Sequence, residues 1–212
     1  MPQSFQRSSG HRHTVVTALA ATLLAVSNAN AQSRQFLSVQ GSGLLTSLSG
    51  DAFDRLRIGT GVGGELQVRV NPSFFSLGAG VQVTRHSSTS QGLSNRMTLT
   101  GFFLEPRYAI PLDNRIVRPY VAGRIALLRQ TTDLEDIGTT FLVKASATAI
   151  GGGGGFVAKI SDFVGFDFGV AVTSANFGTF KYRDTGIDSG LDAGSGVSFV
   201  VKAGFNIGIG KR

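Results

Sequence analysis

Hydrophobic and polar residues alternate through the last part of the chain. From 197 to 209 every second residue is apolar, including Phe199, Phe205 and Ile209, and the residues between are mostly small or polar, with Lys202 as the only charge. A period of two indicates a β-strand with one apolar face. This stretch is longer than the five or six residues of an ordinary strand. It suits a tilted transmembrane β-strand of about 9–11 residues with a short extension.

The same period of two occurs in seven earlier segments. On most of them one face is apolar, as in 57–70, where Ile58, Val62 and Val70 alternate with Glu65 and Arg69. Two segments alternate less cleanly, and their facing stays open. The eight predicted strands are about 36–45, 57–70, 74–86, 97–110, 118–129, 143–159, 164–173 and 197–209, and the two unclear ones are 97–110 and 118–129.

The connections between these segments alternate in length. Those after the second, fourth and sixth strands are short (71–73, 111–117 and 160–163), and the others are longer and polar (46–56, 87–96, 130–142 and 174–194). Outer-membrane barrels have short periplasmic turns and longer extracellular loops, with both termini in the periplasm. The pattern therefore predicts an all-β fold, an eight-stranded antiparallel up-and-down transmembrane β-barrel. A soluble lipocalin-like barrel is the alternative, and it would have a polar outside and an apolar inside.

Charged residues favour the membrane barrel. They lie on the minor face of the cleaner strands, and Lys or Arg facing lipid at mid-membrane costs about 2–4 kcal/mol, so we expect them to point inward. Buried charges must pair, because an unpaired one is costly. We therefore predict an interior network of ion pairs and hydrogen bonds among Glu65, Arg69, Glu105, Arg107, Arg124, Asp167 and Lys202.

The N-terminus has the three parts of an export signal. Arg7 and Arg12 precede an apolar run over 14–26, and Ala29 and Ala31 form an A-x-A cleavage site. The run is shorter than the roughly twenty residues that a spanning helix needs, so no transmembrane helix is expected. We predict a signal peptide at 1–31 and one barrel domain at 32–212. Cleavage would lower the net charge from +7 to +5, and the absence of cysteine excludes disulfides and thiolate chemistry.

Three motifs with possible chemistry receive little support. Residues 59–64 match G-x-G-x-x-G, but a strand pattern follows where the dinucleotide fingerprint needs a helix. Gly151 to Gly155 lacks the Lys-Ser/Thr of a phosphate loop and favours close strand packing or a narrow lumen. His86, the single histidine after residue 31, and Ser88 have the H-x-S spacing of an acyl hydrolase, without a nearby carboxylate to orient the histidine. We therefore expect no catalytic residues and no cofactor.

A metal site is not expected either. One histidine cannot bind a metal alone. Asp184, Asp188 and Asp192 are spaced too widely for a dedicated calcium loop.

Two patches of sequence resemble a known family. Glu105-Pro106-Arg107-Tyr108, followed by 118–124 with Arg118, Tyr120 and Arg124, resembles the small outer-membrane β-barrel superfamily, whose members are similar to the eight-stranded transmembrane domain of OmpA. The chain's end is similar to the family's assembly signal, at Lys202, Gly204, Ile207 and Ile209.

The resemblance implies a place in the outer membrane of a Gram-negative-type bacterium. The implied partners are outer-membrane lipid, lipopolysaccharide and the barrel-assembly machinery. Basic residues are scattered, so a nucleic-acid partner is not expected. The chain has no Trp, and Phe166, Phe168, Phe199 and Phe205 could supply the aromatic girdle.

The sequence favours a non-enzymatic barrel with a side-chain-filled lumen and a structural or surface-interaction role. A small-solute or apolar-solute channel and a lipid A deacylase-like acyl hydrolase are the alternatives. For a surface role, the best contact segment is 174–194, with Phe177, Phe180, Tyr182 and Arg183, although these aromatics could equally extend the seventh strand.

Overall fold

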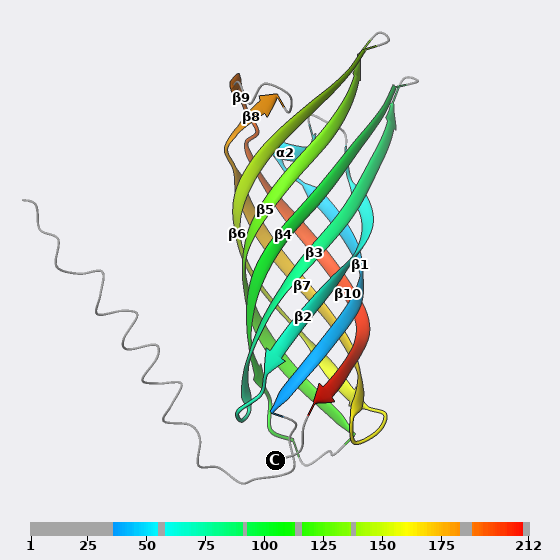
Figure 1. Ribbon diagram of the computed structural model, residues 1–212, viewed down its shortest axis with the longest axis vertical. Coiled ribbons are helices and arrows are strands. Elements are labelled where there is room, and N and C mark those ends of the chain that lie inside the picture. The colour runs from blue at the N-terminus through cyan, green and yellow to red at the C-terminus, as the bar shows by residue number, and fades with distance from the viewer. Residues whose placement is uncertain are drawn as a thin grey trace, which may run out of the picture.

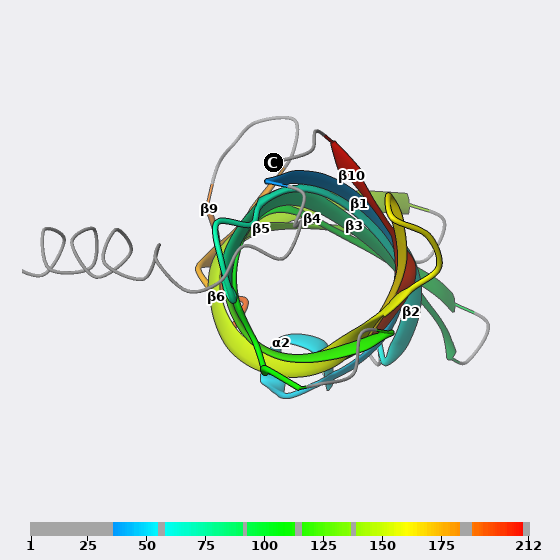
Figure 2. The same cartoon turned by 90° about the horizontal axis from the view of Figure 1, so that it is seen from below.

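The strands form a closed antiparallel barrel in a computed structural model that describes residues 36–54, 58–90, 93–112, 116–136, 139–182 and 188–209. Each barrel strand pairs with its neighbours in sequence, and the first pairs with the last, from Leu37 opposite Ile209 to Ser49 opposite Val197. Figure 1 shows the barrel from the side and Figure 2 shows the closed ring along its axis. The eight barrel strands are β1 (Leu37–Ser49), β2 (Thr60–Val70), β3 (Phe75–Ser90), β4 (Leu93–Ala109), β5 (Val117–Asp136), β6 (Thr139–Lys159), β7 (Val164–Phe177) and β10 (Ser195–Ile209).

The predicted fold is therefore confirmed. The proposed signal peptide, with Ala29 and Ala31, lies outside the described residues. No helix in the described part of the chain is long and apolar enough to cross a membrane.

Two of the predicted long loops are instead mostly strand. The β3–β4 ladder continues to Ser90 opposite Leu93, and the β5–β6 ladder continues to Asp136 opposite Thr139. These hairpins rise beyond the other strands (Figure 1). The sequence prediction was wrong here because it required an apolar face, whereas a hairpin beyond the membrane needs only its backbone hydrogen bonds.

The other two long connections hold short elements. Helix α2 (Asp51–Asp54) follows β1, and the strands β8 (Thr179–Tyr182) and β9 (Asp188–Asp192) lie between β7 and β10. Gly50 has a φ of 105° where the chain turns into α2, a conformation that glycine adopts without strain. We call the barrel end with α2 and the two hairpins the long-loop end, and the opposite end, with the turns at 71–74 and 160–163, the short-turn end.

The outer face of the barrel is apolar. Val62, Phe102 and Ile150 are 64%, 70% and 65% exposed. A water-soluble barrel would not carry such a continuous apolar band on its outside. The prediction that Ile58 shares this outer face was wrong, because Ile58 precedes β2 and is buried.

The structure settles the facing of the two unclear strands. Odd-numbered residues of β4, such as Phe103, point into the lumen, and even-numbered residues of β5, such as Arg124, do the same. Their alternation is blurred because part of the lumen is itself apolar, so that Phe102 and Phe103 occupy opposite faces of β4.

The apolar part of the lumen lies toward the long-loop end. One continuous cluster joins inward residues of β1 and β4–β7 to α2 and to the segments before β2 and β10. Its members are Leu48, Ala52, Phe53, Ile58, Met97, Leu99, Phe103, Ala126, Leu128, Ala145, Ala147, Ala149, Ala175, Phe177 and Ala193, with Phe180 packed against it. We call this cluster the apolar plug.

Candidate functional site

Glu105 lies at the centre of a buried charge cluster in the other part of the lumen. Its Oε1 accepts hydrogen bonds from Arg69 Nη2 at 2.9 Å and from Arg107 Nε at 2.7 Å. Its Oε2 accepts from Arg124 through both Nε and Nη2, and from Lys202 Nζ at 3.0 Å. Four cations from four strands therefore meet at one carboxylate of β4 that is 2% exposed.

Two further carboxylates complete the cluster. Glu65 Oε2 accepts from Arg124 Nη2 at 2.8 Å, and Glu65 Oε1 lies 3.6 Å from Lys202 Nζ. Asp167 Oδ2 accepts from Arg107 Nη1 at 2.5 Å. Four cations thus face three carboxylates, which leaves the cluster with one net positive charge.

The structure brings together all seven residues named from the sequence. It also adds neutral partners that the search for charges missed. Tyr120 donates its hydroxyl hydrogen to Asp167 Oδ1 at 3.0 Å, and its ring lies 4.2 Å from the Arg107 guanidinium. Gln67 and Ser76 accept from Arg69, and Gln82 accepts from Arg124. Once the facing of a strand is known, alternate residues along it point inward, and this rule would have identified each of these neutral residues as facing the lumen.

The charge cluster borders the apolar plug directly. The Arg124 guanidinium stacks over the Phe103 ring, 4.0 Å from its centroid. At the far side of the plug, the Phe53 ring of α2 meets the Phe177 ring edge-on at 5.6 Å. Gly196 makes room for Phe53, because a Cβ there would lie 2.2 Å from its ring.

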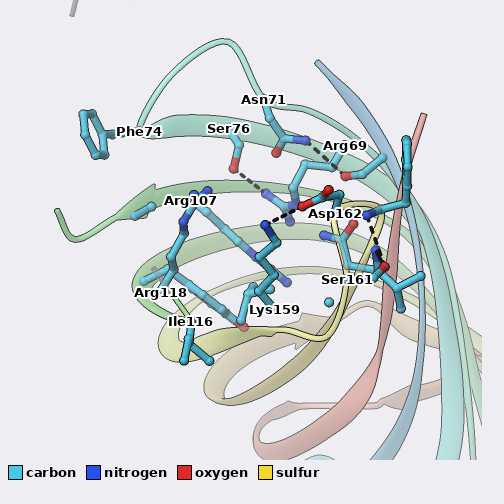
Figure 3. A pocket seen from close by; sticks show the side chains of 18 of the residues that line it. Arg69, Asn71, Phe74, Ser76, Arg107, Ile116, Arg118, Lys159, Ser161 and Asp162 are labelled. Atoms are coloured by element: carbon cyan, nitrogen blue, oxygen red, sulfur yellow. Dashed lines mark hydrogen bonds and ion pairs between the residues drawn. The ribbon is translucent and has the colours of Figure 1, made fainter. Parts of the chain in front are cut away.

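A cavity of about 370 Å³ lies between the charge cluster and the short-turn end. Figure 3 shows Arg69, Arg107, Arg118 and Lys159 on its lining, together with Asp162. Asp162 accepts a hydrogen bond from Lys159 at 2.6 Å, and both side chains are exposed. The lumen is therefore hollow at the short-turn end and filled by side chains further in.

An apolar outer band around a polar lumen is typical of outer-membrane barrels. Residues 16–205 match the family model described as outer membrane protein beta-barrel domain. The chain belongs to this family. The match begins within the predicted signal peptide and ends inside the last barrel strand of this outer-membrane barrel protein.

Solved outer-membrane barrels share its fold. Neisserial surface protein A is 14% identical, with a TM-score of 0.52 over 84% of this chain and 100% of that one. Ail, the attachment invasion locus protein of Yersinia pestis, solved with the heparin analogue sucrose octasulfate, is 14% identical, with a TM-score of 0.50 over 81% and 97%. No curated protein matches the chain.

The described contacts of His86 differ from those of a catalytic base. It is 3% exposed and points into the lumen, where Nε2 lies 3.1 Å from Thr84 Oγ1 and Nδ1 lies 3.4 Å from the Gly59 carbonyl oxygen. None of these contacts is a carboxylate that could orient the ring. The side chain of Ser88 lies outside the described residues, as do Asp184 and the side chains of Asp188 and Asp192. The described residues contain no cluster of metal-ligating side chains.

The remaining named residues divide between the two faces of the barrel. In the proposed assembly signal Lys202 and Gly204 point inward, and Ile207 and Ile209 point outward. Of the girdle candidates, Phe166 packs on Phe205 at 5.8 Å and Phe168 packs on Phe156 at 5.7 Å, while Phe199 is exposed.

The aromatic residues of segment 174–194 separate as well. Phe177 is buried in the apolar plug and Phe180 packs against it, whereas Tyr182 stays exposed. Arg183 lies outside the described residues.

Proposed function

We propose that this chain is a non-enzymatic outer-membrane barrel with a closed lumen and a structural or surface-interaction role. The observation that carries the proposal is the filling of the lumen at two successive levels, by the charge cluster around Glu105 and by the apolar plug under α2. Eight strands enclose an interior that side chains can just fill.

The orientation is part of the proposal. The short turns and both ends of the barrel chain would lie in the periplasm, and the β3–β4 and β5–β6 hairpins would project outside the cell. Short periplasmic turns and longer extracellular connections are the rule in bacterial barrels. Outer-membrane lipid, lipopolysaccharide and the assembly machinery are the expected partners, and no nucleic-acid partner is expected.

A channel is the second candidate, and the cavity at the short-turn end favours it. A small polar solute could enter there but would meet the charge cluster, whose side chains are nine-tenths or more buried. An apolar solute arriving from the other end would meet Phe53, which is 1% exposed. Passage would require both layers to move.

Planar-bilayer conductance, together with gel mobility before and after boiling, tests the closed lumen. We expect a heat-dependent mobility shift, which marks a folded barrel, and no steady conductance above the bare bilayer. A reproducible ohmic conductance from protein that shows the shift would contradict a closed lumen and favour the channel.

A second arm tests the non-enzymatic part of the proposal. We expect no release of fatty acid from lipid A by the folded barrel. Release that His86→Ala abolished would instead favour the acyl hydrolase.

A further inference from the structure

Positive charge on the outer face of the described strands gathers at one side of the long-loop end. Arg85 of β3, Arg96 of β4 and Arg129 of β5 are exposed there, and Lys144 of β6 is half-buried. None of these four makes an ion pair with a carboxylate whose side chain the structure describes, a set that leaves out Glu135 and Asp136. Asp133 stands opposite Arg96 in the β4–β5 register, but no ion pair joins the two side chains.

Beyond β6, the rest of this rim carries one such charge in the described residues, the exposed Lys181 of β8, which stands opposite Lys144. At the same end of β1, β2, β7 and β10 the exposed outward residues are small, polar and neutral: Ser47, Thr60, Ser174, Asn176 and Ser195. Arginines and neutral polar residues would both be well solvated at a membrane surface. The restriction of the arginines to β3, β4 and β5 therefore calls for a local explanation.

The strand register places these arginines around a pair of threonines. Arg85 is directly opposite Thr98 of β4, and Arg129 is directly opposite Thr100 of the same strand. Arg96 lies two residues before Thr98 in β4, on the same outer face. Directly opposed residues have Cβ atoms about 5 Å apart, so the three guanidinium groups can reach the surface of β4 around the threonine hydroxyls.

The tilt of the strands brings two of the arginines to one height. On the near side of the barrel, β3, β4 and β5 lean to the right as they rise, with β3 to the right of β5 (Figure 1). For a tilt of about 40° and a strand spacing of about 4.8 Å, each strand crossed from β3 toward β6 raises the position by about 3 Å, and two residues along a strand change it by about 5 Å. Arg129 is two strands away from Arg85 and two residues nearer the short-turn end than Thr131, the residue of β5 in line with Arg85. The two effects nearly cancel, so Arg129 lies within about 2 Å of the height of Arg85.

The apolar band begins immediately below. Two residues further toward the short-turn end than Thr100 and Arg129, three apolar residues stand in register on β3, β4 and β5, namely Val81, Phe102 and Leu127. All three are exposed and point outward. This surface therefore joins a cationic, hydroxyl-bearing rim to an apolar face without a gap. A ligand that matches it has an anionic head and acyl chains.

We propose that the outer surface formed by Arg85, Arg96, Thr98, Thr100 and Arg129 binds the phosphate of a phosphorylated glycolipid in the adjoining leaflet. Arginine binds phosphate oxygens through two parallel N–H groups, and the threonine hydroxyls supply further donors. The acyl chains lie on Val81, Phe102 and Leu127. The proposal rests on the proposed function, because the orientation given there places this rim at the outer leaflet, where lipopolysaccharide would be the source of the phosphate.

Native mass spectrometry of the purified barrel in non-ionic detergent, titrated with diphosphoryl lipid A, tests the proposal. The double variant R85Q/R129Q should bind this lipid at least about tenfold more weakly than the wild type, since two charge-assisted contacts are lost. R85K/R129K, which keeps the charge but loses the paired N–H geometry, should fall between them. The control R118Q/K159Q removes the same charge from the short-turn end and should stay within about twofold of the wild type.

Equal affinity of the wild type and R85Q/R129Q would overturn the proposal. An equal loss in both glutamine double variants would overturn it too, because it would show attraction to net charge rather than to this surface. The heat-dependent gel shift checks that each variant is folded. Binding in detergent depends on neither the conductance nor the orientation of the barrel, so failure here is distinguishable from failure of the closed-lumen proposal.

Discussion

Glu105 is the single residue on which the interior charges depend most. It contacts four cations, whereas Glu65 and Asp167 each contact one or two. In Glu105→Gln four cations would face two carboxylates, and removing one partner from a buried ion pair costs about 3–5 kcal/mol. We expect a loss of this size in the free energy of unfolding, measured by urea titration of the barrel refolded in detergent.

The matched control at the residue scale is Lys159→Gln. It breaks the Lys159–Asp162 ion pair, whose side chains are 52% and 77% exposed. Exposed pairs contribute about 0–1 kcal/mol, so the urea midpoint should hardly move. Equal shifts for the two variants would mean that the interior pairs are as well solvated as the surface pair, against the burial of the cluster.

At the scale of the element, the glycines of β6 set how closely that strand approaches β7. A Cβ at Gly153 would lie 2.0 Å from the Val170 carbonyl oxygen, whereas one at Gly152, on the outer face, would lie 3.3 Å from the Ala122 carbonyl oxygen. Gly153→Ala should therefore lower the free energy of unfolding by about 1–3 kcal/mol or prevent refolding, as overpacking does. Gly152→Ala should refold nearly as well as the wild type, and the heat-dependent gel shift of both variants measures this.

If Gly152→Ala refolded less well than Gly153→Ala, the result would contradict the close approach of β6 to β7. The sequence predicted close strand packing or a narrow lumen at Gly151 to Gly155 without choosing between them. The structure gives close packing against β7, because the carbonyl oxygens of that strand occupy the space of the missing side chains.

At the scale of the whole molecule, the apolar outer band defines how the barrel sits in a membrane. Leu66 and Thr60 lie on the same outer face of β2, Leu66 within the band and Thr60 at its long-loop edge. Leu66→Arg should cost about 2–4 kcal/mol on refolding into phospholipid vesicles, and Thr60→Arg should cost about 0–1 kcal/mol, because the penalty falls toward the interface. Similar costs for both would place the bilayer elsewhere on the barrel.

The sequence by itself determined the architecture of this protein. Lipid on one side of each strand demands apolar residues at every second position, and the eight segments, their order and the inward charges follow from that demand. The closed strand ladder and the family match confirm the architecture. The seven charged residues could be named in advance because a membrane strand tolerates charged side chains only on the face that points away from lipid.

Only the tertiary structure decided what each side chain meets inside the barrel. The apolar plug, with Phe53 and Phe177 closing the lumen, joins segments far apart in the sequence and shares the apolar composition of the lipid-facing band. Likewise, the hub role of Glu105 and the gathering of arginines around Thr98 depend on strand register across the barrel. Alternation along one strand fixes the face on which a residue lies, whereas its partners are fixed by the neighbouring strands and the closure of the sheet.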